Sequence, residues 1–204
     1  MTSTAACSLP FPADHEIFGV QLKHLRTFPD DRGFFREVVR SNDPFFQIHT
    51  GVSGAVTNDE CSAAFQQWSH SRMSKNVVKA WHYHHLQFDW WYLAIGQIET
   101  VLFDNRPESP TYKKKLVFRM GDSSFGPDTA ELCVRIPPGV LHGLKVLSPE
   151  AHLFYITSQI YDANEEGRFP FNSPLVGHDW GTDVLTVEND RRTFEPTSVR
   201  ALIR

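Results

Sequence analysis

Three histidines and one aspartate carry the strongest chemical signal in the sequence. His82 and His84 alternate in a short run, so on a β-strand both side chains point to one face. Asp89 follows five residues after His84, and His142 comes just after the Pro-Pro-Gly turn at 137–139. Three imidazoles and a carboxylate are a suitable ligand set for a divalent first-row ion such as iron, manganese, nickel or zinc. In the alternative interpretation, the histidines are hydrogen-bonded barrel residues and Asp89 lies on a turn.

The two stretches that contain these residues resemble the signature motifs of the cupin superfamily. The first motif is His-x-His, then a carboxylate and then Gly96, with Asp89 in place of the usual Glu. The second is Pro-x-Gly-x-x-His, which ends at His142. The resemblance implies an all-β fold, a cupin-type antiparallel β-barrel or jelly roll. It does not by itself imply a metal, because one fold supports many functions.

Short apolar or alternating runs recur from residue 77 onward, separated by residues that favour turns. Such spacing is typical of an antiparallel sandwich or barrel. The expected strands lie at 77–84, 91–95, 98–103, 116–120, 132–136, 143–147 and 152–157.

The two ends of the chain are less regular. We expect N-terminal strands at 19–28 and 34–39, joined by a turn, and a short helix within 42–46 that Asp43 caps. After Ile160 we expect loops and short helices over one end of the barrel. Because no repeat or linker-like tract divides the sequence, residues 1–204 are expected to form a single cupin-like domain, with 1–17 as a flexible N-terminal arm.

Charge and cysteine usage narrow the class of protein. With 20 Lys and Arg against 24 Asp and Glu, the chain has no basic surplus for a phosphate backbone, so nucleic acid is not an expected partner. The 3 cysteines are far apart and form no CxxC motif, which favours neither disulfides nor a cysteine zinc site. No apolar stretch approaches the length of a membrane span, and we expect a cytoplasmic protein without a membrane partner.

A more specific resemblance covers residues 18–190. An ordered set of motifs resembles the dTDP-4-dehydrorhamnose 3,5-epimerase family, a cupin-fold branch that acts on nucleotide-linked 4-keto-6-deoxy sugars. The matching stretches are 30–37 (Asp-Asp-Arg-Gly-Phe-Phe-Arg-Glu), 69–71, 79–83, 104–106 with 109–111, 136–143, 154–161, 172–177 and 179–180.

The resemblance implies proton-transfer chemistry beside a ketone. A proton next to the C4 ketone is acidic because its removal gives an enolate, so the enzyme needs a base on one face and an acid on the other. The resemblance makes His82 the base and Tyr155 the acid, and places His142 near the ketone. Without it, Tyr155 could equally be a core strand residue. The carboxylate that orients the base falls on Asp190, or the position falls on Asn189 if the match has no insertion.

The resemblance also implies contacts with a nucleotide-diphosphate sugar. Arg32 matches a diphosphate contact that typically reaches into the neighbouring subunit's site, so a homodimer is expected. Lys79 stands where the family has Arg, but a regular strand puts Lys79 and His82 on opposite faces. A twist or bulge is therefore needed for both to contact one ligand. The other expected substrate contacts are His84, Phe35, Glu37 and Tyr161.

Asp89 is the most serious departure from the family pattern. A Lys that normally steadies the enolate oxygen is replaced by Asp89, and a carboxylate there acts in the opposite sense. One hypothesis is that His84 and Asp89, with His82 and His142, create a metal site that polarises the ketone. His82 then has two conflicting roles, because a metal-bound imidazole cannot also be the base. The competing explanation is drift in a subfamily that binds a different sugar.

The sequence therefore predicts an isomerase that inverts C3, C5 or both in a nucleotide-linked 4-keto-6-deoxyhexose. We favour an enzyme without a cofactor, with a divalent metal as the alternative. One rival hypothesis is a metal-dependent cupin isomerase or oxygenase that uses the three histidines and Asp89. A second is a barrel that binds a nucleotide sugar without catalysis.

Overall fold

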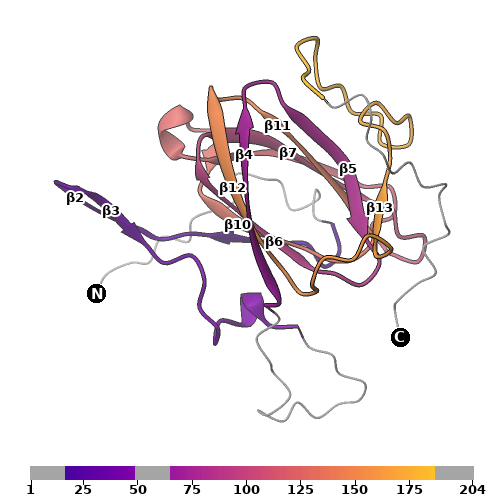
Figure 1. Ribbon diagram of the computed structural model, residues 1–204, viewed down its shortest axis with the longest axis horizontal. Helices are drawn as coiled ribbons and strands as arrows, with labels where there is room; N and C mark the ends of the chain where they lie inside the picture. Colours follow the sequence, from indigo (N-terminus) through magenta and orange to yellow (C-terminus); the bar gives the residue numbers. More distant parts are fainter. Residues whose placement is uncertain (1–16, 49–64, 187–204) are drawn as a thin grey trace.

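Two facing β-sheets make up most of the computed structural model, which describes residues 17–48 and 65–186 (Figure 1). The first sheet has the order β1-β10-β6-β12-β4 and the second has the order β13-β5-β11-β7-β8-β9. The first contains β1 (Gln21–His24), β4 (Gln67–Ser74), β6 (Asp89–Ile95), β10 (Leu132–Ile136) and β12 (Glu150–Thr157). The second contains β5 (Val78–His84), β7 (Gln97–Asp104), β8 (Lys115–Gly121), β9 (Thr129–Ala130), β11 (Val140–Val146) and β13 (Glu166–Arg168). All pairings within the sheets are antiparallel except that of β8 with β9, so the expected jelly-roll class is confirmed.

The strands β5 to β8 and β10 to β12 lie close to the predicted ranges, whereas the short strands β9 and β13 were not predicted. Strand β4 was not predicted either. Its side chains alternate between intermediate and exposed positions until Met73, and most are polar. An apolar period of two is the main signal for a strand. β4 lacks that signal because it is the edge strand of its sheet, paired only with β12.

The N-terminal prediction of one strand over 19–28 is wrong. The chain forms β1, which pairs with β10, and then β2 (Thr27–Asp30), which pairs only with β3 (Gly33–Arg36). Figure 1 shows the β2–β3 hairpin extending away from the two sheets. The short helix is confirmed as a 3-10 helix, η2 (Pro44–Phe46), in which the Asp43 carboxylate accepts a hydrogen bond from the Phe45 N–H at 3.0 Å. Residues 1–16 of the expected arm lie outside the described residues.

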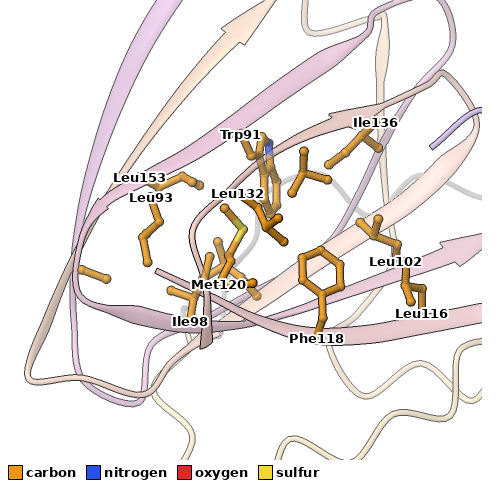
Figure 2. Packing of buried hydrophobic residues seen from close by; sticks show 14 of the residues in the cluster. Trp91, Leu93, Ile98, Leu102, Leu116, Phe118, Met120, Leu132, Ile136 and Leu153 are labelled. Atoms are coloured by element: carbon orange, nitrogen blue, oxygen red, sulfur yellow. The ribbon is translucent and has the colours of Figure 1, made fainter. Parts of the chain in front are cut away.

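The main apolar core lies between the two sheets and fills the part near β7, β8 and β10 (Figure 2). Its side chains come from both sheets, because alternate residues of each strand face inward. Trp91 and Leu153 of the first sheet and Ile98, Phe118 and Met120 of the second all belong to this cluster.

Part of the outer face of each sheet is also covered. The segment after β13 packs over Trp81 and Tyr83 with Phe169, Phe171 and Trp180, so it covers a sheet face. The expected short helices are absent from this segment as far as residue 186, where the structure shows loops and β13. The helix η2 packs against Trp90 on the other sheet, whose indole N–H donates to the Phe45 carbonyl at 2.8 Å. In the described residues, no helix is long and apolar enough to cross a membrane.

Candidate active site

A cavity of about 760 Å³ opens between the two sheets, beside the apolar core. One wall comes from β4, β6 and β12, and the other from β5, β11, β13 and the segment at 169–172. Cavities of this size accommodate small-molecule ligands. The expected site residues that line it are Lys79, His82, His84, Asp89, His142, Tyr155 and Tyr161.

A bulge in β5 brings Lys79 and His82 to the same cavity. In the pairing of β5 with β11, His82 lies opposite His142 and Lys79 lies opposite Leu144, so the register shifts between these pairs. Three steps along β5 therefore match two steps along β11. Gly143 permits this close approach, because a Cβ atom there would lie 2.7 Å from the Cβ of Ala80. The bulge that the sequence required for a shared ligand is present.

His82 is held as a neutral imidazole in the cavity wall. Its side chain keeps 28% of its surface accessible, and its Nδ1 lies 3.6 Å from Oε1 of Glu166. Enclosure among the cavity walls, followed by the charge of Arg168, lowers the pKa of His82 to about 3. The ring is therefore unprotonated at neutral pH, as a general base must be.

The other two histidines converge on Asp89. Nε2 of His84 and Nε2 of His142 each lie 3.8 Å from Oδ2 of Asp89, and all three residues are buried. His82 is not a member of this cluster, so the predicted set of four ligands becomes a set of three. Burial lowers the pKa of His142 to about 3, although the charge of Asp89 opposes that shift.

Polar groups behind the cluster fix its imidazoles. His84 Nδ1 lies 3.0 Å from Oε2 of Glu165, and His142 Nδ1 lies 3.1 Å from the carbonyl oxygen of Val140. Burial opposes charge on His84, but the hydrogen bond to Glu165 and the charge of Asp89 raise its pKa above the ordinary value. Gln87 donates to Oδ1 of Asp89 at 2.7 Å.

Tyr155 faces the cavity from the sheet opposite His82. It belongs to β12, whereas His82 belongs to β5, and both residues line the same space. A ligand in the cavity thus has an imidazole on one side and a phenol on the other. Tyr161 also lines the cavity and is 52% exposed.

Positive charge gathers along the same wall. Lys79 donates to the Ser71 hydroxyl at 2.7 Å. Arg168 lies opposite His82 in the pairing of β13 with β5, and its Nε donates to the Glu166 carboxylate. Partial enclosure and the charge of Arg168 lower the pKa of Lys79. Because the two cations disfavour each other, an anionic group between them would be stabilised.

Comparison with known proteins agrees with this geometry. Residues 14–195 match the family model described as dTDP-4-dehydrorhamnose 3,5-epimerase. The chain belongs to this family. It is 32% identical over 170 residues to the Bacillus subtilis spore coat polysaccharide biosynthesis protein SpsL, covering 82% of this chain and 98% of that protein. It is 28% identical over 181 residues to dTDP-4-dehydrorhamnose 3,5-epimerase of Salmonella typhimurium, covering 87% of this chain and 90% of that enzyme.

A solved relative confirms the fold. The crystal structure of a dTDP sugar isomerase from Desulfovibrio desulfuricans G20 superposes with a TM-score of 0.66 at 26% identity, covering 82% of this chain and 95% of that one. The expected isomerase class and epimerase activity, and the expected cupin-type fold, are confirmed by membership of the epimerase family.

Three residues expected to bind substrate do not reach the cavity of their own chain. Arg32 lies at the turn of the β2–β3 hairpin with 89% of its side chain exposed and pairs with Asp30 at 2.7 Å. Phe35 is 67% exposed on β3, and Glu37 pairs with Arg40 at 2.6 Å. In Figure 1 the hairpin points away from the sheets that form the cavity.

The sequence motifs of the epimerase family did not identify every residue of the site. Asn189 and Asp190 lie outside the described residues, so the carboxylate predicted to orient His82 stays a prediction. Glu165, Glu166 and Arg168 were missed, although β13 places them beside His84 and His82. They sit in a polar stretch after Ile160 that carries no apolar period, so only the cluster of charge at 165–168 marked it.

Proposed function

We propose that this protein is a cytoplasmic epimerase that acts on a nucleotide-diphosphate-linked 4-keto-6-deoxyhexose at C3, C5 or both. The observation that carries the proposal is the placement of His82 and Tyr155 on facing sheets of one cavity. Inversion at a carbon next to a ketone requires removal of a proton from one face and its return from the other. The neutral imidazole of His82 removes the proton, and the phenol of Tyr155 returns one.

The cations of the cavity wall support a diphosphate-linked substrate. Lys79 and Arg168 lie on the same wall as His82, and each can neutralise a phosphate oxygen. His142 and His84 lie deeper beside Asp89, where the reacting part of the sugar would sit. Tyr161 is exposed and lines the cavity, so a bound nucleotide could contact it.

The exposed hairpin supports a homodimer. Phe28, Phe34 and Phe35 are each more than two-fifths exposed on a two-stranded hairpin, an element that is marginally stable in isolation. In a dimer, the hairpin of one protomer would place Arg32, Phe35 and Glu37 at the cavity of its partner. A mixture of His82→Ala and Arg32→Ala subunits should then recover activity that neither variant has alone. Failure of the exchanged mixture to recover activity would overturn the shared site and leave the base unaffected.

Solvent exchange tests the epimerase directly. A panel of nucleotide-linked 4-keto-6-deoxy sugars is incubated with the protein in D2O, and deuterium at C3 and C5 is followed by NMR. His82→Ala should lower exchange by about 10²–10⁴-fold, the usual contribution of a general base. His85→Ala is the matched control, because His85 lies three residues after His82 and its ring packs against Tyr83 on the outer face of the sheet. Exchange that survives in His82→Ala would exclude His82 as the base.

Replacement of the acid separates exchange from inversion. In Tyr155→Phe, His82 can still remove a proton and return a deuteron to the same face. We expect deuterium incorporation to continue while the inverted product falls. Equal loss of both would contradict a role for Tyr155 confined to the second face.

A further inference from the structure

Three potential ligand atoms meet at the inner end of the cavity without bonding to one another. Nε2 of His84, Nε2 of His142 and an oxygen of Asp89 all lie within 4.8 Å of one another. Each imidazole nitrogen is 3.8 Å from Oδ2 of Asp89, which is too long for a hydrogen bond. Ligand atoms bound to one ion at about 2.0–2.2 Å can lie up to about 4 Å apart, and both 3.8 Å distances to Asp89 meet this limit.

The far side of each imidazole is already held by a hydrogen-bond acceptor. Nδ1 of His84 donates to Glu165, and Nδ1 of His142 donates to the Val140 carbonyl. In the neutral form with the proton on Nδ1, each ring has its lone pair on Nε2, the nitrogen that lies 3.8 Å from Oδ2 of Asp89. A carboxylate or carbonyl behind a ligand histidine is the usual arrangement around protein-bound metals, since it fixes both tautomer and ring orientation.

The contacts of Gln87 agree with this tautomer of His84. Asp89 is an acceptor, so the amide end of Gln87 that lies 2.7 Å from its Oδ1 is the NH2 group. The same nitrogen lies 3.1 Å from Nε2 of His84, which therefore accepts. Hence Nε2 of His84 carries a lone pair, and a cation bound there would replace the hydrogen bond from Gln87.

The geometry points to a binding site for a divalent first-row transition-metal ion, formed by His84, Asp89 and His142. Two imidazole nitrogens and one carboxylate oxygen form a ligand set that leaves coordination positions open, here toward the cavity. His82 lies outside this set, and its nearest carboxylate is Glu166. The conflict raised by the sequence therefore disappears, because the base and the metal ligands are different histidines.

The role of the ion rests on the proposed epimerase, whereas its binding does not. An ion at this site supplies the positive charge that the Lys of the family pattern would supply to the developing oxyanion. His84, Asp89 and His142 would hold it, and His82 would remain available to remove the proton. The carboxylate of Asp89, unfavourable to an enolate by itself, then has a positive partner.

Metal binding is measured first, without reference to activity. The full-length protein is treated with a chelator, dialysed and titrated with Co²⁺, while the visible ligand-field absorption and the bound metal are followed. Wild-type protein should bind one ion per chain. Asp89→Asn and His142→Gln should each weaken binding by about 100-fold or more, and His85→Gln should bind as the wild type does. No bound Co²⁺ in wild type, or unchanged binding in both ligand variants that remain folded by circular dichroism, would overturn the site.

Deuterium exchange by the stripped and reloaded protein then tests the role of the ion. If removal of the metal lowers deuterium exchange and added Co²⁺ or Zn²⁺ restores it, the result supports the ion as the electrophile. Full exchange in stripped protein that contains no metal would overturn that role and leave the epimerase established. Tight Co²⁺ binding without exchange on any sugar of the panel would overturn the proposed function and support the metal site alone.

Discussion

Asp104 and Asp89 are both buried carboxylates at strand ends, but their surroundings differ. Asp104 ends β7, and its oxygens accept from Nε of Arg106 at 2.7 Å and from the hydroxyls of Ser109 and Thr111 at 2.6 Å each. Asp89 begins β6 and accepts from Gln87 at 2.7 Å and from the indole of Trp91 at 3.3 Å. Within residues 17–48 and 65–186, no Lys or Arg forms an ion pair with Asp89.

The difference shows how one residue type can serve stability or function. A buried charge costs free energy unless it is paired and hydrogen-bonded, and Asp104 meets both conditions. Asp89 accepts hydrogen bonds, but within residues 17–48 and 65–186 it pairs with no Lys or Arg, and the Nε2 atoms of two histidines lie near it. A carboxylate whose surroundings lack the expected cation is suited to receiving one from outside the chain. The comparison therefore assigns Asp104 to the stability of the β7 turn and Asp89 to the chemistry of the cavity.

Asp104→Asn should have the largest effect on stability. The substitution leaves the guanidinium of Arg106, 14% exposed, without its counter-charge, and breaking a buried pair in this way costs about 3–5 kcal/mol. Urea denaturation of the variant measures this loss. The control is Asp128→Asn, which removes an exposed ion pair with Arg119 and should cost less than about 1 kcal/mol. If Asp104→Asn lowers the free energy of unfolding no more than Asp128→Asn does, Asp104 contributes little to stability.

Asp89→Asn should have a much smaller effect on stability and a large one on function. Replacing a partly satisfied buried carboxylate by the amide removes a desolvation cost, and Gln87 can still donate to the remaining oxygen. We expect the free energy of unfolding of metal-free protein to change by less than about 1 kcal/mol. Urea denaturation of chelator-treated protein provides the measurement. A loss equal to that of Asp104→Asn would break the comparison, because Asp89 would then be a structural residue.

The sequence predicted those features of the site that depend on the local pattern of residues. The alternation of His82 and His84 predicted their shared face, and both side chains line the cavity. The bulge followed from the spacing of Lys79 and His82 if both contact one ligand. These inferences rest on the period of a strand and need no knowledge of distant residues.

The remaining parts depend on pairings between distant segments. Glu165 reaches His84 only because β13 pairs with β5, across a separation of about eighty residues that no local pattern reveals. The projection of the β2–β3 hairpin depends on the chain leaving the first sheet after His24, and no Gly or Pro between His24 and Phe28 marks that point in the sequence. Separation of His82 from the other two histidines likewise depends on the positions of β6 and β11 relative to β5.

The pH dependence of stability offers the smallest and most selective test of the comparison. Burial opposes ionisation of Asp104, but hydrogen bonds from Arg106, Ser109 and Thr111 outweigh it and lower its pKa below the ordinary 3.8. A carboxyl with a lowered pKa stabilises the folded state at any pH above its unfolded value, and this contribution is lost as pH falls through the folded value. The difference in unfolding free energy between wild type and Asp104→Asn should therefore stay constant from pH 7 to about pH 5 and shrink below about pH 4. Urea denaturation of both proteins across this range measures the difference. A constant difference down to pH 3 would mean that the hydrogen-bond geometry around Asp104, and not its charge, provides the stability.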